Sequence, residues 1–507
     1  TLKIKTMYKF FSMVIATALS LNLVAQSDVD ALRYSTLDFG GTARSLGSGN
    51  AYGALGGDMS SFSMNPAGIG IYRGSEFVLT PGLLSINSES SYLGTKTVED
   101  KYKFTINNAG IVFASVKRGK ENATTGWVTG AFGISYNRLA NFNSSVLYTG
   151  YNEGSSLLNS YVDYLNGNGG TNPGEVFDKD PFGAGLAWET YLINPSGADS
   201  TQYFPVVEGN VQQTKSIATQ GGIGETAITF GGNYGNRLYV GATIGIPHIS
   251  YIVSSVYTES DVNGEYDNFE SFTLTDVSET YGTGINAKLG LIYRINDNLR
   301  LGAAVHSPTL YGLNDNYISS MSSNLEGDGE YEFDSPIGEF SYELVTPWRV
   351  IGSAAVTIKK IGFISAEYEF VDYSESSFNF NRTFDAGDIS YENTINTNID
   401  TKYGAASIIR LGGELTYDVF RFRGGYIMSS SPFNDGIAAD GADFAKNTWT
   451  AGLGIKEDDY FIDLAFAHSN TKEYDIQYVY DNGAGVNQGA TIDKTFNNFL
   501  LSFGFRF

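Results

Sequence analysis

Stretches in which apolar residues alternate with small or polar ones constrain this chain more than any other feature. The segment "RLYVGATIGIPHISY" (237–251) places an apolar side chain at every second position, with Tyr, Gly and Thr between them. The segments "NLRLGAAVH" (298–306) and "FLLSFGFRF" (499–507) follow the same rule. A period of two is typical of a β-strand with one apolar face. The chain is therefore predicted to be all-β, and its apolar faces belong either to the core of a soluble sandwich or to lipid.

The connections between the candidate strands distinguish these two folds. About fourteen candidate strands are joined alternately by short turns, such as "GNR" (235–237) and "INDN" (295–298), and by long segments. The long segments are 88–103, 140–221, 253–280, 309–345, 373–403, 431–446 and 470–495, of which 140–221 is the longest. Short turns at one end and long loops at the other are typical of an outer-membrane barrel. We therefore predict a transmembrane antiparallel β-barrel of about 14 strands, with its termini and short turns on the periplasmic side.

The first residues indicate export. Lys3, Lys5 and Lys9 precede an uncharged apolar run, "FFSMVIATALSLNLVA" (10–25). This pattern predicts a signal peptide at 1–26. The alternative is an N-terminal membrane anchor, for which the run is short.

Composition excludes several functions. The chain has no Cys, which excludes a disulfide scaffold and Cys-based metal sites, and its formal charge of −23 argues against nucleic acid. His248, His306 and His468 are scattered, so no metal site and no cofactor are expected. Ser307 and Ser469 adjoin two of these histidines, but neighbouring strand residues face opposite ways, so no enzyme is predicted. Haem ligation by a single His stays open as an alternative.

Residues 27–73 lie between the signal peptide and the predicted barrel (74–507). They are rich in Gly, Ala and Ser and contain the tripeptide Asn65, Pro66 and Ala67. Small residues suit close packing in a confined space, so this segment is predicted to be a hatch that plugs the barrel lumen. Pro66 fixes its backbone and the adjacent glycines permit unusual turns, which gives either a movable kink or a rigid plug.

The run "GTARSLGSGNAYGALGGDMSSFSMNPAGI" (41–69) resembles the hatch of the FadL-type long-chain fatty acid transporters, in which an Asn-Pro-Ala motif occurs. Segments "VTPWRV" (345–350) and "RGGYIMSSSPFNDG" (423–436) are similar to other parts of that family, in particular its Bacteroidetes-like branch. The resemblance implies a fourteen-stranded barrel for passive uptake of hydrophobic compounds such as long-chain fatty acids. It also implies that ligand passes from the outer loops to an internal pocket gated by the hatch, and leaves through a gap in the wall. The long 140–221 segment departs from the family pattern.

Candidate pocket residues come from the hatch and from the lumen face of the strands. Arg300 and Arg506 are expected to face the lumen, where they either meet a ligand carboxylate or pair with Asp463. For the apolar candidates the alternative is core packing of the plug. These candidates are Phe39, Leu46, Leu55, Met59, Phe62, Met64 and Ile69.

The expected location is the outer membrane of a Gram-negative bacterium, with three kinds of partner. They are hydrophobic small molecules such as fatty acids, outer-membrane lipid and lipopolysaccharide, and the barrel assembly machinery, which reads the terminal Phe507. The acidic segments 324–334 and 433–444 either bind divalent cations that bridge lipopolysaccharide or are solvated loops. The alternative function is a non-transporting scaffold for protein secretion or surface attachment, which the long 140–221 segment would suit.

Overall fold

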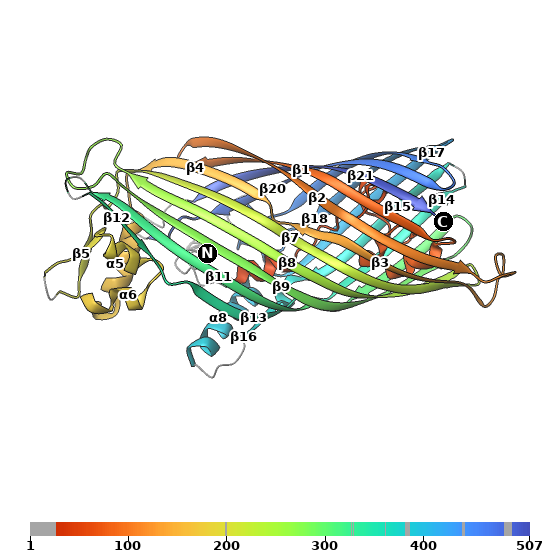
Figure 1. Cartoon of the computed structure of the whole chain (residues 1–507), viewed down its shortest axis with the longest axis horizontal. Coiled ribbons are helices and arrows are strands. Elements are labelled where there is room, and N and C mark those ends of the chain that lie inside the picture. The colour runs from red at the N-terminus through yellow and green to blue at the C-terminus, as the bar shows by residue number, and fades with distance from the viewer. Residues whose placement is uncertain are drawn as a thin grey trace, which may run out of the picture.

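The structure is a computed structural model. It describes residues 27–197, 200–325, 327, 329–359, 361–380, 386–438, 442–480 and 489–507. The predicted signal peptide, 1–26, lies outside the described residues. The chain forms one elongated barrel with helices inside it and at one end (Figure 1).

Nineteen strand segments form one sheet in which every pairing is antiparallel, and they make up a closed wall of 14 strands, as predicted. The wall closes because β1 pairs with both β2 and β21. The segments are β1 (Glu76–Tyr92), β2 (Thr95–Val116), β3 (Trp127–Asn141), β4 (Ser144–Asn152), β7 (Val211–Tyr234), β8 (Leu238–Ser260), β9 (Ser271–Arg294), β10 (Leu299–His306), β11 (Leu310–Leu325), β12 (Gly329–Asp334), β13 (Gly338–Val345), β14 (Arg349–Ile358), β15 (Gly362–Asp372), β16 (Ser377–Phe380), β17 (Ala405–Tyr417), β18 (Phe420–Ser429), β19 (Lys446–Lys456), β20 (Tyr460–Asp475) and β21 (Ala490–Arg506).

Several wall strands consist of segments in series. Pro308 separates β10 from β11, and Pro347 separates β13 from β14, because proline cannot donate to a β-ladder. The prediction of a loop at 309–345 is therefore wrong, since this range forms β11, β12 and β13. Strands also extend into the predicted loops 88–103 and 253–280. These extensions are rich in Ser and Thr, and apolar residues alternate over only a short stretch, such as Phe272 and Leu274, so the pattern does not reveal them.

The outward face of the wall is an apolar belt. Ile244 of β8 is 48% exposed whereas its neighbour Thr243, which faces the lumen, is 2% exposed. At the C-terminus Phe503 and Phe505 are exposed while Ser502 is fully buried. The alternating faces predicted from the sequence are thus confirmed, with the apolar side outward, as in a transmembrane barrel.

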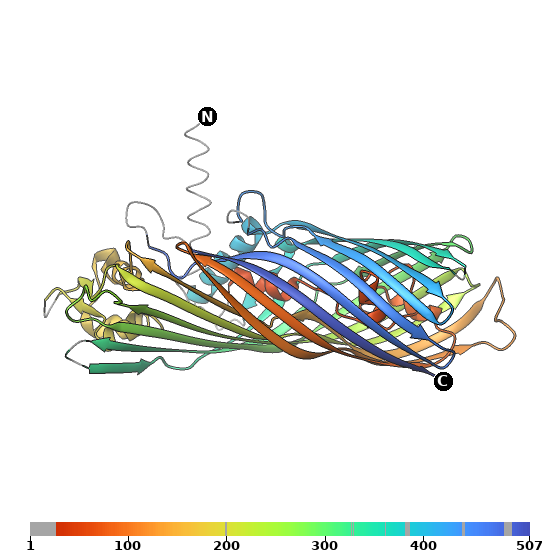
Figure 2. The same cartoon turned by 90° about the horizontal axis from the view of Figure 1, so that it is seen from above.

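The hatch precedes β1 and lies inside the barrel, where Figure 2 shows its red helices enclosed by the wall. It contains α2 (Asp28–Ser35), α3 (Ala43–Gly47), α4 (Ser61–Met64) and the 3-10 helix η2 (Pro66–Ile71). Among the described residues no helix is both long and apolar enough to cross a membrane.

Within the predicted long segment 140–221, the helices and short strands between β4 and β7 form an outer dome at the end of the barrel opposite the C-terminus (Figure 1). The prediction of a loop is wrong at both ends of this segment, which belong to β3, β4 and β7. A separate helix, α8, follows β16 and precedes β17. The described part of the acidic segment, 324–325 and 329–334, is not a free loop, because these residues pair in the β11–β12 hairpin. The elements of the dome are α5 (Leu157–Asn166), η3 (Gly167–Gly169), η4 (Pro173–Glu175), α6 (Val176–Lys179), α7 (Ala184–Glu189), β5 (Ile193–Pro195) and β6 (Tyr203–Pro205). The 3-10 helix η5 (Tyr373–Glu375) follows β15, and α8 spans Ala386–Lys402.

Candidate functional site: the hatch, a seam in the wall and two cavities

The Asn-Pro-Ala motif starts η2 and fastens the hatch to itself and to the wall. The Asn65 side chain accepts a hydrogen bond from the Ala67 backbone N–H (3.1 Å) and caps the helix. Its amide donates to the carbonyl oxygens of Gly53 (2.6 Å) and Leu291 (3.3 Å). Pro66 occupies the first helical position, where a missing N–H costs nothing. The motif is therefore a buried junction of two hatch segments and β9.

Glycines in the wall make room for this motif. A Cβ atom on Gly290 would lie 2.0 Å from Asn65 Oδ1, and one on Gly241 would lie 2.1 Å from the Pro66 carbonyl oxygen. Both distances are far below a van der Waals contact, so only glycine fits. Many of the chain's 60 glycines thus serve close approach of hatch and wall.

Buried charges in the lumen also hold the hatch. Lys288 and Glu225 pair at 2.5 Å, and Glu225 accepts a hydrogen bond from Ser63 of α4 (2.6 Å). On the opposite wall Glu367 accepts from the Gly53 backbone N–H (2.9 Å) and pairs with Arg410 (2.8 Å). Removing one partner of such a buried pair typically costs 3–5 kcal/mol, because it leaves a charge uncompensated.

The wall contains a seam between β2 and β3. Nine residue pairs join these strands, from Val116↔Thr129 to Asn108↔Asn137. Above this level β2 pairs only with β1, while the end of β3 and all of β4 pair only with β7. Side chains bridge the seam in place of a ladder, since Lys101 Nζ donates to the carbonyl oxygens of Ser144 (3.1 Å) and Thr219 (2.8 Å).

A hatch segment closes the lower end of the seam from inside. The Asp38 backbone N–H donates to the Leu139 carbonyl (2.6 Å), and the Gly40 N–H donates to the Arg138 carbonyl (2.8 Å). Both carbonyls lie on β3 directly above its last pair with β2. At about 3.3 Å per residue and a tilt of about 45°, nine pairs rise about 21 Å. This rise is shorter than a membrane core of about 30 Å, so the ladder between β2 and β3 does not span the core.

An apolar cluster, here called the hatch-top cluster, lies between the hatch and the outer elements. Its members are buried side chains of α2 and Phe39, the lumen faces of the wall strands, and α8. They include Ala31, Leu32, Tyr34, Phe39, Met64, Leu139, Ile249, Tyr311, Leu313, Tyr342, Leu344, Phe378, Phe380, Ile395 and Ile399. The cavity at its lower edge, beside Tyr34 and His306, measures only about 20 Å³.

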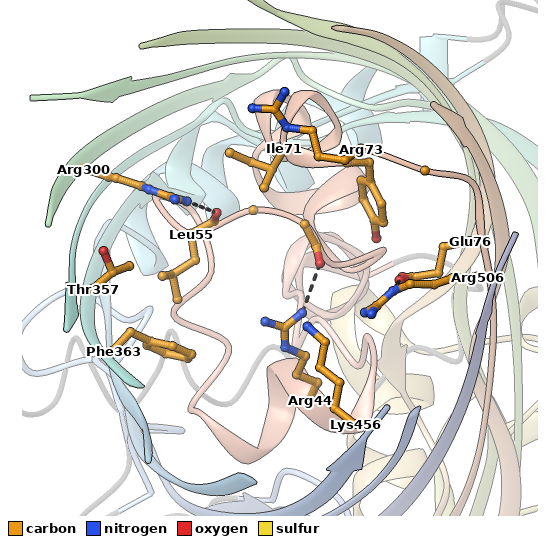
Figure 3. Close-up of a pocket in the computed structure, with 14 residues that line it drawn as sticks. Arg44, Leu55, Ile71, Arg73, Glu76, Arg300, Thr357, Phe363, Lys456 and Arg506 are labelled. Carbon is orange, nitrogen blue, oxygen red and sulfur yellow. Dashed lines mark hydrogen bonds and ion pairs between the residues drawn. The ribbon is translucent and has the colours of Figure 1, made fainter. Parts of the chain in front are cut away.

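A larger cavity, about 410 Å³, lies beneath the hatch at the end of the barrel that carries the C-terminus (Figure 3). Arg44 reaches across it to donate to the Gly57 carbonyl (3.1 Å), and Arg300 donates to the Leu55 carbonyl (3.1 Å). Arg506 pairs with Glu76 (2.9 Å). The cavity is thus polar and cationic, in contrast with the hatch-top cluster.

The predicted pocket residues do not form one site. Phe39 and Met64 belong to the hatch-top cluster, whereas Leu55, Arg300 and Arg506 line the lower cavity. The others are buried between hatch and wall: Met59, Phe62 and Ile69 in one group, and Leu46 in another. A ligand role for any of them stays a prediction.

The suggested ion pairs of Arg300 and Arg506 with Asp463 are wrong. Asp463 does face the lumen, but it pairs with Arg423 (2.6 Å). Strand alternation gives the direction of a side chain, whereas its partner depends on which strands lie side by side.

Three functional features escaped sequence analysis. No sequence pattern indicates the backbone hydrogen bonds from 38–40 to β3, and none indicates where the β2–β3 ladder ends. Arg33 of α2 was also missed. It pairs with Asp30 and lies 4.3 Å from the centre of the Tyr251 ring, at the edge of the hatch-top cluster. The one signal was that 27–73 contains only three cations, Arg33, Arg44 and Arg73.

His248, His306 and His468 lie on three different strand segments, β8, β10 and β20. The ring of His306 contacts the Met64 carbonyl oxygen (2.7 Å) in the buried lumen, and His468 contacts Asn497 (2.8 Å). In the part of the chain that the structure describes, no group of three His, Asp or Glu residues could hold a metal ion.

Comparisons with known proteins agree with the architecture. No family model and no curated protein sequence matches the chain. Among solved structures, a Pseudomonas aeruginosa FadL homologue matches with a TM-score of 0.55 and 11% identity, over 93% of this chain and 99% of that one. The Pseudomonas putida toluene transporter TodX matches with a TM-score of 0.51 and 12% identity, over 93% of this chain and 100% of that one. The resemblance noted in the hatch is thus confirmed at the level of fold: this chain has the barrel-and-hatch fold of the FadL-type outer-membrane transporters.

Proposed function

We propose that this barrel is a passive channel for the uptake of hydrophobic compounds across an outer membrane. The observation that carries the proposal is the seam between β2 and β3, closed from inside by the hatch segment 38–40. A sealed porin-like wall would have no reason to leave strand edges for a plug to cover, because unpaired backbone groups are costly in lipid. The solved structure of similar fold that is described as a toluene transporter supports the same class of ligand.

The proposed path runs from the outer end through the hatch-top cluster to the seam. Phe39 connects the hatch-top cluster with the seam. It belongs to that cluster and lies between Asp38 and Gly40, whose backbone N–H groups donate to β3. A hydrophobic ligand would replace side-chain contacts in the cluster and leave through the seam into the membrane. Neither step needs an energy source.

Gating by the hatch is part of the proposal. The cavity beside the cluster holds about 20 Å³, too little for an alkyl chain, so passage along this path requires the hatch to move. The closing segment is held by its two backbone bonds to β3, by a hydrogen bond from Asn50 to the Phe39 carbonyl (2.7 Å) and by a partly exposed ion pair between Asp38 and Lys446 (3.0 Å). Further along the hatch, buried ion pairs of the wall hold Gly53 and Ser63, so movement is expected in 35–41 rather than in the whole plug.

Long-chain fatty acids are the proposed ligands. Each buried methylene contributes about 0.8 kcal/mol, so a long chain gains affinity even when partly enclosed. Arg33 provides a cation at the edge of the cluster for the carboxylate, in place of Arg300 and Arg506, which lie below the hatch.

Uptake in cells tests the proposal. The full chain is expressed in a Gram-negative host that lacks its own fatty acid transporter, and uptake of labelled oleate and toluene is measured. We expect uptake of oleate well above that of the empty host. Uptake of toluene alone would retain the channel and reject the fatty acid, and uptake of neither would reject transport.

A matched pair of variants tests the seam. A Cβ atom on Gly40 would lie 3.0 Å from the Arg138 carbonyl and 3.1 Å from Asn107 Oδ1, so Gly40→Val should push 38–40 off β3. The control is Gly130→Val in β3, because a Cβ atom on Gly130 would meet nothing within 4 Å. We expect only Gly40→Val to make cells permeable to large hydrophobic antibiotics. Equal resistance of both variants would show that the segment does not close the seam.

One observation favours the scaffold as a second candidate. The outer dome has its own apolar core, which includes Leu158, Leu165 and Leu186, yet it exposes Tyr191 and Phe204 (54% and 49%). Such exposed aromatics suit protein binding. If no compound is taken up, this function becomes the leading one.

A further inference from the structure

The cavity beneath the hatch carries a large excess of positive charge. Its lining contains five cations, Arg44, Arg73, Arg300, Lys456 and Arg506, but one carboxylate, Glu76. The small cavity beside it adds two further arginines and two carboxylates, so the excess of four remains. Figure 3 shows Arg44 and Lys456 pointing into the same space from below, with Arg300 on one side and Arg506 on the other.

Two of these cations are incompletely paired. The Arg300 Nε is buried and has no hydrogen-bond partner within the described residues, although its Nη1 donates to Leu55. Within the same residues no carboxylate or carbonyl pairs with the Lys456 ammonium, which lines both cavities. Grouped cations repel one another at low dielectric, so an arrangement of this kind is stabilised by a bound anion.

The chemistry of the lining indicates which anion. An excess of four charges exceeds what one carboxylate would balance, whereas a phosphate carries up to two charges and several strong acceptor oxygens. Guanidinium groups match phosphate through paired N–H donors, and an ammonium group contributes a point charge. Leu55, Ile71 and Phe363 form an apolar side of the cavity, which leaves room for an organic group.

We propose that this cavity binds an anion of the phosphate class, either free phosphate or the headgroup of a phospholipid. Arg44 belongs to the hatch, whereas Arg300, Lys456 and Arg506 belong to the wall. A bound phosphate would therefore join hatch to wall from the periplasmic side and stabilise the hatch in its closed position. This site is separate from the proposed hydrophobic path and does not depend on transport.

The test is calorimetric titration of inorganic phosphate into the detergent-purified full chain at constant ionic strength. We expect saturable 1:1 binding that weakens at least tenfold in Lys456→Gln. Lys120→Gln removes an exposed cation from the 117–126 turn at the same end of the barrel and should bind as the parent does. Absence of saturable heat, or equal weakening in both variants, would overturn the proposal.

A replacement variant and two further measurements make the result decisive. If Lys456→Gln does not fold, as judged by the heat-dependent gel mobility of the barrel, Arg300→Gln replaces it, with the same tenfold expectation. Hydrogen exchange of 53–57 and 71–74 should slow with phosphate, and unchanged exchange would reject the bridge between hatch and wall. A short-chain phosphatidic acid is compared with phosphate: tighter binding of the lipid assigns a headgroup site, and equal binding assigns free phosphate.

Discussion

Asp28 and Lys402 form a buried ion pair that ties the first helix of the hatch to α8 of the outer elements. The Lys402 Nζ lies 3.1 Å from both Asp28 oxygens, and both side chains are almost inaccessible to solvent. The Tyr403 hydroxyl donates to the same carboxylate (2.9 Å). The hatch therefore has a direct connection to the outer part of the chain.

Breaking this pair should loosen the hatch. We expect Asp28→Asn to cost about 3–5 kcal/mol locally, because it leaves the Lys402 charge buried without a partner. Hydrogen exchange of α2 and α8 measures the change, and both should exchange faster. Lys96→Gln breaks an exposed pair with Glu89 and should change stability by less than about 1 kcal/mol. Unaltered exchange in Asp28→Asn would show that the pair does not hold the two helices.

The hatch motif gives a second prediction. Asn65→Ala removes one accepted and two donated hydrogen bonds at a fully buried position, which should cost about 1–3 kcal/mol. Hydrogen exchange at 53–67 should rise, while exchange in β20 and β21 stays the same. Asn87→Ala, which removes one exposed bond to Asp100, is the control. If both variants leave 53–67 protected, packing against the wall glycines holds the motif without Asn65.

The outer dome should become more stable in mild acid because of Asp180. Desolvation raises the pKa of this carboxyl above its ordinary value, although backbone N–H donors, including that of Ala184, oppose the rise. The folded state thus holds a proton that the unfolded state has lost, so stability falls as pH rises between the two pKa values. Asp180→Asn should protect the dome from proteolysis at neutral pH and have no effect below about pH 3.8. The exposed Asp178→Asn is the control, and equal effects of the two variants would contradict this account.

The wall could be predicted from the sequence because its signals are local. Alternation in 237–251 and 499–507 gives both the strand and the direction of each face, and Ile244 and Ser502 lie as expected. The hatch was recognisable because a run rich in Gly and Ser before a barrel has few other uses. The even strand number followed from the alternation of short and long connections.

The site could not be predicted, because it depends on contacts between distant segments. Nothing near Asn108 indicates that the ladder between β2 and β3 ends there, since the preceding residues of β2 are also strand. Asp463 was expected to meet Arg506, but its neighbour across the lumen face is Arg423. Glycines such as Gly290 read as strand glycines and are explained only by the hatch atoms that approach them.

Locking the hatch tests the central claim most directly. The hydroxyl oxygens of Ser35 in α2 and Ser376 before β16 lie 3.2 Å apart, so Ser35→Cys with Ser376→Cys should form a disulfide. The chain has no other cysteine. Thr448→Cys with Ser469→Cys joins two wall strands whose hydroxyls lie 2.8 Å apart and leaves the hatch free. We predict that oxidation abolishes oleate uptake in the first variant alone and that a reductant restores it. Full uptake through the oxidised Ser35–Ser376 variant would contradict a moving hatch and establish a rigid plug.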